Sequence, residues 1–203
     1  MRRNEFEVLD ERAIVACLNE SEYGVLSLMS DQEPYGVALN FVYEAGVVYF
    51  HGSKEGKKAE AIDSHPRASF LVVKPYAYIP SYFFNTTLAS PATQFFASVH
   101  FFGEIHRIDS MEEKAKALSA LMQKYQKEGG YDPVGAKDPR YKNVIEKTAI
   151  FALSPHTCSM KVKVGQNLPK ERQEHVIQQL QERNAPNDLD TIVVMRKITD
   201  ERI

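Results

Sequence analysis

The chain has 203 residues, with 25 basic and 27 acidic side chains and a formal net charge of -2 at pH 7. This balance gives no global field that would attract nucleic acid or an anionic membrane, so any anion site has to be local. Two cysteines are too few for a disulfide framework or a self-sufficient zinc site, and they suit a reducing compartment. No window holds the roughly 18 uninterrupted apolar residues of a membrane span, so we expect a cytoplasmic protein.

The first part of the chain alternates helical and extended patterns. A short amphipathic helix capped by Asp10 is expected to end before Tyr23. Strands with intervening turns follow, at 23–29, 34–43, 47–52 and 67–73. Between the last two strands we expect a short helix from Gly56 to Ser64, because the residue before Pro66 avoids the α region.

The second part begins with an irregular but ordered excursion over 74–94. A long strand over 94–108 should be interrupted near Gly103, where a bulge or bend is expected. Ser110 and Glu113 form a capping box that predicts a helix ending at Gly129. The remaining predicted elements are a helix at 140–147, strands at 148–153 and 160–165 separated by a break at Pro155, a surface helix at 169–183 and a loosely attached tail over the last twenty residues.

This order of elements predicts a mainly β fold, an antiparallel barrel with peripheral α-helices, rather than a doubly wound parallel sheet. We expect one domain over residues 1–165. Residues 166–203 should form a helix and tail that pack on this domain or extend from it.

The segment FHGSKEGKKAEAI carries the clearest chemical signal. A strand ends at Phe50, a helix begins near Gly56, and the residues between and just after them are rich in lysine and small side chains. Free backbone N–H groups, the helix dipole and ammonium groups together favour a phosphate. A solvated basic turn is the alternative, and the glycine spacing does not match a Walker loop.

Other chemistries find less support. The histidines are scattered, without the spacing of a metal site: His51, His65, His100, His106, His156 and His175. Neither Ser53 nor Ser98 lies in a G-x-S-x-G elbow. Cys158 and His156 could pair as nucleophile and base on one strand, but a structural or exposed thiol explains them better.

Three segments in order resemble the pyridoxamine 5'-phosphate oxidase-like FMN-binding split-barrel superfamily, and more closely its branch of nitroimidazole-resistance proteins. They are YGVLSLM, PYGVALNFVYEAGVVYFHGSKEGKKAEAI with HPRASFLV, and PATQFFASVHFFGEIHRI. The resemblance covers about residues 11 to 163 and implies a split barrel whose cofactor is FMN. The carboxyl-terminal part lacks the arginine-containing elements with which true pyridoxamine phosphate oxidases hold their substrate.

The resemblance also implies a set of cofactor-binding residues. Lys57 and Lys58 would hold the FMN phosphate, the strand Val37–Asn40 would lie along the flavin ring, and Ser98 would reach the cofactor from a later strand. The full set is Val37, Ala38, Leu39, Asn40, His51, Gly52, Ser53, Lys54, Lys57, Lys58 and Ser98. His51 is the candidate catalytic residue, because a near-neutral pKa suits proton exchange.

The implied assembly is a homodimer with FMN sites at the subunit interface. The implied activity is that of an FMN-dependent oxidoreductase that reduces a small organic acceptor, nitroreductase-like or related to pyridoxamine phosphate oxidase, with NAD(P)H as a candidate donor. The alternatives are a flavin-binding storage or sensor module without robust turnover, and a haem-binding split-barrel protein.

Overall fold

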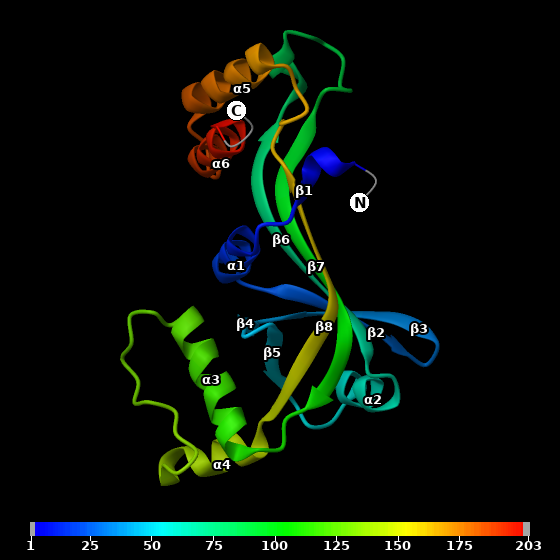
Figure 1. Ribbon diagram of the computed structural model, residues 1–203, viewed down its shortest axis with the longest axis vertical. Helices are drawn as coiled ribbons and strands as arrows, with labels where there is room; N and C mark the ends of the chain where they lie inside the picture. The colour runs from blue at the N-terminus through cyan, green and yellow to red at the C-terminus, as the bar shows by residue number, and fades with distance from the viewer. Residues whose placement is uncertain (1–2, 201–203) are drawn as a thin grey trace. The chain divides into compact units, whose positions relative to one another are not determined.

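In the computed structural model, residues 3–200 are described, with side chains up to residue 198. The strands of this part are β1 (Glu7–Val8), β2 (Gly24–Ser30), β3 (Glu33–Leu39), β4 (Val42–Glu44), β5 (Val47–Gly52), β6 (Arg67–Ile79), β7 (Thr93–Arg107) and β8 (Ala149–Lys163). The helices are α1 (Glu11–Glu20), α2 (Lys57–Ser64), α3 (Met111–Tyr125), α4 (Pro139–Lys147), α5 (Lys170–Arg183) and α6 (Asp188–Asp200), with short 3-10 turns at Asn4–Phe6 and Ser81–Phe84. Figure 1 follows these elements along the chain.

The strands form one open sheet in the order β3-β2-β6-β7-β8-β5-β4, with β1 paired to β8. The pairings of β2 with β3 and β6, of β5 with β4 and β8, and of β1 with β8 are antiparallel. β3 and β4 are its two edges, so the sheet is not closed. The predicted mainly β, antiparallel architecture with peripheral helices is confirmed.

Contacts divide the chain into two compact units. Unit 1 comprises the residues up to Asp10, residues 73–98 and the chain from Met160 onward; unit 2 comprises 11–72 and 99–159. The long strands β6, β7 and β8 contribute residues to both units.

In unit 2, the β2–β3 hairpin forms as predicted. Asp31 and Gln32 both have positive φ, 52° and 65°, which matches the twist of a two-residue hairpin. The expected single strand over 34–43 is wrong, because β3 ends at Leu39 and β4 begins at Val42. Between them the N–H of the fully buried Phe41 donates to the hydroxyl of Tyr125 at 3.0 Å, so the backbone leaves the ladder at this point.

The expected interruption of β7 at Gly103 is wrong, since the strand runs unbroken from Thr93 to Arg107. A Cβ at Gly103 would lie 2.3 Å from the carbonyl oxygen of Ser154. The glycine therefore permits a close backbone approach at this point of the strand.

The expected break at Pro155 is also wrong, because β8 is continuous from Ala149 to Lys163. β8 pairs with β5 over 149–153 and with β1 at 160–161. Pro155 falls between these stretches, where its missing N–H interrupts neither pairing.

In unit 1, the predicted loose tail is a helix. α6 packs against α5 and buries Ile192 and Met195. The hydroxyl of Thr191 accepts from the N–H of Ala77 at 2.8 Å. The excursion expected over 74–94 is shorter than predicted, because β6 extends to Ile79.

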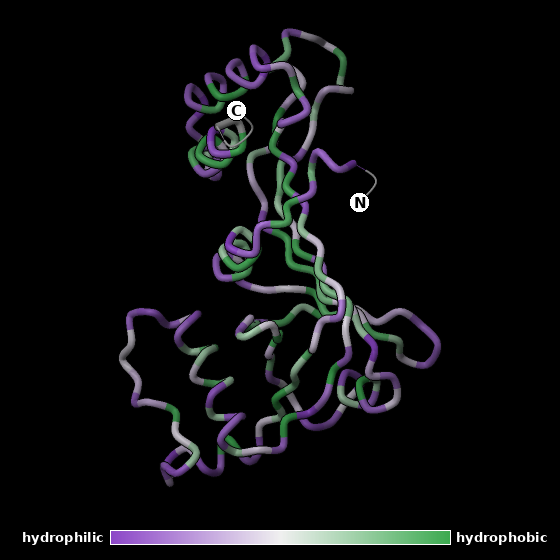
Figure 2. Tube along the Cα trace, viewed as in Figure 1, coloured by the Kyte–Doolittle hydropathy of each residue, from purple (hydrophilic) through white to green (hydrophobic). Residues whose placement is uncertain are grey.

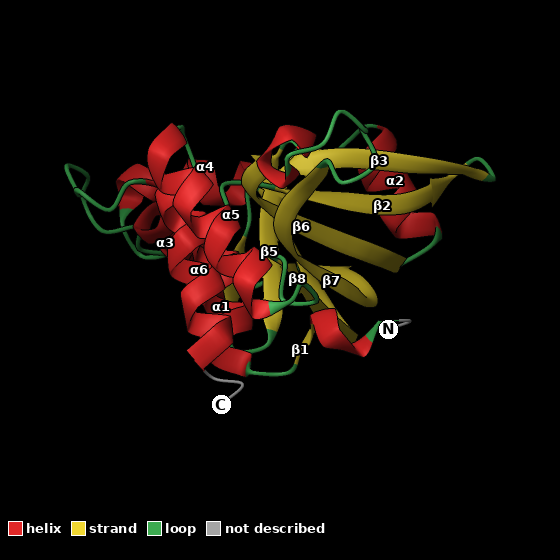
Figure 3. Cartoon of the chain, turned by 90° about the horizontal axis from the view of Figure 1, so that it is seen from above, coloured by secondary structure: helices red, strands yellow, loops and turns green. Residues whose placement is uncertain are grey.

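Apolar residues follow the strands in Figure 2. In unit 2 they form a core of aliphatic and aromatic side chains, in which Phe41 and Phe70 meet edge to face with ring centroids 5.1 Å apart. α2 packs against β2 and lies beside the β2–β3 hairpin (Figure 3). This arrangement places Lys57, at the start of α2, next to Tyr35 of the edge strand β3.

Candidate functional site

The start of α2 offers unpaired backbone donors. Gly56 is its N-cap residue, with φ of 100° and no side-chain cap. The first helical hydrogen bond runs from Glu60 N–H to the Gly56 carbonyl at 3.1 Å, so the N–H groups of the first turn have no partner within the helix. Upstream, the hydroxyl of Ser53 accepts from Glu55 N–H at 3.1 Å. This geometry leaves an electropositive helix end facing outward.

Lys58 folds back over the end of β5. Its Nζ lies 5.7 Å from the ring centroid of Phe50 and 5.4 Å from that of Phe151. These rings stack at 5.4 Å on directly paired residues of β5 and β8. The side chain of Lys58 is half-buried, and this burial lowers its pKa.

Gly52 makes this position of Lys58 possible. A Cβ at Gly52 would lie 2.1 Å from the Nζ of Lys58. The ammonium therefore occupies the space directly above the strand end. His51, the preceding residue, has its pKa lowered first by desolvation and then by the charge of Lys58, which favours the neutral imidazole.

Two further lysines lie at the α2 corner, the region where β5 ends and α2 begins. The Nζ of Lys57 is 5.1 Å from the ring centroid of Tyr35 on β3, and Lys54 is exposed. Within the part of the chain whose side chains are described, none of Lys54, Lys57 and Lys58 forms an ion pair with a carboxylate. The corner thus holds three cations without an anionic partner.

Arg107 is part of this corner but is already paired. It donates to both carboxylate oxygens of Asp63, at 2.9 and 2.6 Å, and to the carbonyl of Lys54 at 3.1 Å. The guanidinium lowers the pKa of Asp63 and lies 5.5 Å from the ring centroid of Phe151. Arg107 therefore fixes the loop between β5 and α2, and sequence reasoning missed it because the contact spans 44 residues.

β3 carries the predicted ring-contacting segment. Val37 and Leu39 are half-buried, whereas Ala38 and Asn40 are exposed. The amide of Asn40 donates to the carbonyl of Glu22 at 3.0 Å, so it helps to fix the end of β3. β3 is an edge strand, and its free edge is open to a ligand or another chain.

The predicted site residues are only partly brought together. Unit 2 places His51, Gly52 and Lys58 in direct proximity, and Lys57 contacts a residue of β3. Ser98 belongs to unit 1, where it is half-buried on β7.

A cavity of about 710 Å³ lies elsewhere in unit 2, between α3, the turn at Glu44–Ala45 and residues 134–137. None of the predicted site residues lines it. A second cavity, of about 430 Å³, is lined by Asn40 and Lys124 among others. The ammonium of Lys124 donates to the Leu18 carbonyl at 2.9 Å, and burial, with a smaller effect of Lys127, lowers its pKa to about 8.

Over residues 3–198, whose side chains the structure describes, the His, Cys, Asp and Glu side chains form no group that could hold a metal ion. None of the helices in this range has the length and apolar character needed to cross a membrane.

The fold is similar to that of several solved structures. One is the flavocytochrome Anf3 of Azotobacter vinelandii, with a TM-score of 0.65 and 23% identity over 80% of this chain and 72% of that chain. Another is a candidate 5-nitroimidazole antibiotic resistance protein of Bacteroides thetaiotaomicron, with a TM-score of 0.63 and 20% identity over 77% of this chain and 86% of that chain. A third is the FAD and haem binding protein of Mycobacterium smegmatis, with a TM-score of 0.61 and 16% identity over 77% of this chain and 73% of that chain. At identities this low, the likeness concerns the fold alone.

No curated protein matches the sequence significantly. Residues 10–162 match the pyridoxamine 5'-phosphate oxidase family. This match spans most of the chain and agrees with the open antiparallel sheet. The chain therefore has a split-barrel fold and belongs to the pyridoxamine 5'-phosphate oxidase family.

Proposed function

We propose that the protein binds FMN and acts as an oxidoreductase on a small organic acceptor. The observation that carries the proposal is the position of Lys58 at the start of α2. Its half-buried ammonium lies above Gly52, the last residue of β5, and has no carboxylate partner. A cation partly withdrawn from water is costly unless an anion compensates it. A phosphomonoester at this corner supplies that anion and also accepts from the free N–H groups of α2.

The rest of the cofactor requires an apolar surface beside the phosphate. β3 provides one through Val37 and Leu39, which leave the same face of the strand as Tyr35 beside Lys57. Flavin contacts along a strand are made largely through backbone groups, and an edge strand keeps those groups available. A bound flavin would supply the redox chemistry. The part of this chain would be to fix the cofactor and to place the neutral imidazole of His51 near the strand end, where it can accept a proton.

We further propose a homodimer in which the flavin lies between subunits. Met29 on β2 and Phe102 on β7 are 43% and 44% exposed, which is unusual for large apolar side chains on the strands of a sheet. Sedimentation at micromolar concentration should give twice the chain mass. A monomer that binds FMN with full affinity would contradict the shared site.

The phosphate assignment is tested by comparing ligands that differ in the phosphate. We expect Lys57→Gln/Lys58→Gln to weaken FMN binding by at least about tenfold, or ~1.4 kcal/mol, in a fluorescence titration. Riboflavin, which lacks the phosphate, should bind both proteins equally. Lys142→Gln/Lys147→Gln, on α4 of the same unit, removes the same charge and should change neither constant. An unchanged FMN constant in the first variant contradicts the assignment.

Turnover separates an enzyme from a storage or sensor module. We expect steady oxidation of NADPH with a quinone or nitroaromatic acceptor to exceed the rate with free FMN. A protein that holds flavin without such a rate is a binder only. One similar structure is named a FAD and haem binding protein and another a flavocytochrome, so haem titration belongs in the same experiment. A Soret shift that is abolished by saturating FMN would indicate a shared pocket.

A further inference from the structure

We propose that Arg3, Lys161 and Lys163 of unit 1 form a second anion site, one that binds the phosphomonoester group of a small molecule. This basic cluster is separate from the lysines at α2, which belong to unit 2. The inference does not depend on the proposed flavin function.

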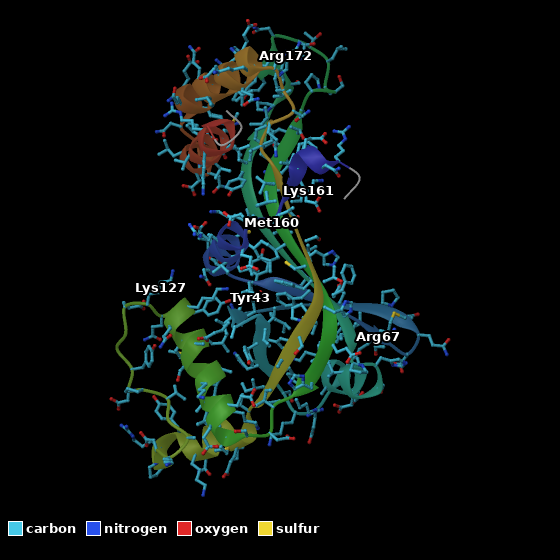
Figure 4. All side chains as sticks on the ribbon, viewed as in Figure 1. Tyr43, Arg67, Lys127, Met160, Lys161 and Arg172 are labelled. Atoms are coloured by element: carbon cyan, nitrogen blue, oxygen red, sulfur yellow. The ribbon has the colours of Figure 1, made fainter. Side chains whose placement is uncertain are left out.

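The cluster is built on one face of β8. Lys161 and Lys163 are two residues apart on the strand, so their side chains leave the same face, and the alternating residues Met160, Val162 and Val164 are buried. Figure 4 labels Lys161 and Met160 at this part of β8. The two lysines are only half-buried, which leaves their ammonium groups reachable from solvent.

Neighbouring residues hold each cation in place. The Nζ of Lys161 lies 5.7 Å from the ring centroid of Phe6 and 5.2 Å from that of Phe96. The guanidinium carbon of Arg3 is 5.9 Å from the centroid of Phe6. Lys163 donates to the hydroxyl of Thr93. Rings restrain a cation without neutralising it, so the cluster keeps its full charge.

Among the side chains described, those of residues 3–198, no carboxylate forms an ion pair with Arg3, Lys161 or Lys163. Glu7 is opposite Lys161 in the β1–β8 register. The pKa of Lys163 is lowered first by burial and then by the charges of Lys161 and Arg3. The three cations therefore repel one another, and an anion bound among them would relieve that repulsion.

The chemistry of the cluster favours a phosphomonoester. Two ammonium groups act as compact point charges, and a guanidinium offers a planar fork that matches phosphate oxygens. A dianion interacts with all three cations at once, whereas a single carboxylate carries half its charge. We therefore expect ribose 5-phosphate and AMP to bind through their shared phosphate, and adenosine not to bind.

Calorimetric titration at low ionic strength tests the site. The protein used carries Lys57→Gln/Lys58→Gln, so that the α2 corner cannot contribute. We expect one ribose 5-phosphate per chain, with an affinity that falls as salt is added. Adding Lys161→Gln/Lys163→Gln should weaken binding at least tenfold. Lys170→Gln/Arg172→Gln, which removes two charges from α5 of the same unit, should leave it unchanged.

Two results would overturn the site: unchanged ribose 5-phosphate binding after Lys161→Gln/Lys163→Gln, or adenosine binding as tightly as AMP. If the double variant fails to fold, Arg3→Gln alone replaces an exposed side chain and should still weaken binding by threefold or more. FMN titration of Lys161→Gln/Lys163→Gln in the otherwise natural chain keeps the two proposals apart. The FMN constant of the α2 corner should be unchanged in this variant, because that corner lies in unit 2 and does not use Lys161 or Lys163.

Discussion

Replacing Gly52 with alanine tests the position of Lys58 without touching its charge. The new methyl group would lie 2.1 Å from the Nζ and 3.1 Å from the Cε of Lys58. These atoms end a flexible side chain, so we expect the ammonium to move and the fold to persist. The loss of one charge-assisted hydrogen bond to phosphate costs about 1.5–3 kcal/mol, which weakens FMN binding roughly 10- to 150-fold.

A double-mutant cycle isolates this mechanism. In a Lys58→Ala background the alanine at position 52 has nothing to displace, so its effect on FMN affinity should vanish. Gly135→Ala is the matched control, because its Cβ would make only an ordinary contact, 3.8 Å from the Cβ of Asp138. The measurements are flavin fluorescence titrations with urea unfolding as the check on folding. A folded Gly52→Ala protein with natural FMN affinity would refute the assigned position of Lys58.

Further predictions concern packing and titration. Gly103→Ala should lower the free energy of unfolding by about 2 kcal/mol or more, because the methyl group meets the backbone of Ser154 at 2.3 Å; urea unfolding measures the loss, and natural stability would contradict the close approach. The pKa of Lys124, near 8 when folded, lies below its unfolded value of 10.5, so the folded chain binds fewer protons there and stability should rise with pH across that window. Lys124→Met should lack this rise in urea unfolding between pH 7.5 and 10, and equal slopes would count against the lowered pKa. Asp188 is fully buried and ion-paired with Arg183 at 2.5 Å, so Asp188→Ala should cost about 3 kcal/mol, measured by thermal unfolding. A change within error would show that the pair is dispensable.

Local sequence signals predicted the elements whose stabilising contacts are themselves local. The capping box forms as expected, with the hydroxyl of Ser110 accepting from Glu113 N–H at 3.3 Å, and α3 follows from it. The β2–β3 hairpin rests on two consecutive turn residues. In both cases the residues that decide the structure are neighbours in the chain, so their pattern is sufficient.

Elements that depend on distant contacts were mispredicted. α6 was expected to be a loose tail, yet the hydroxyl of Thr191 accepts from the N–H of Ala77, 114 residues away. The sequence pattern around Pro155 predicted a break in the strand. Proline disrupts a sheet only where a neighbouring strand needs the N–H group that proline lacks. That information lies in the sheet pairing, which the sequence does not display.

The candidate site shows the same difference between features that local sequence predicts and features that depend on distant contacts. Lysines between a strand and a helix are local and were found, but a solvated turn has the same pattern. What separates the two is the path of Lys58, which returns over Gly52 and the rings of Phe50 and Phe151 instead of extending into solvent. Phe151 reaches this corner only through the pairing of β8 with β5. A lysine that gives up hydration without gaining a carboxylate is poorly explained by folding alone, and the anionic ligand proposed at the start of α2 would compensate its charge.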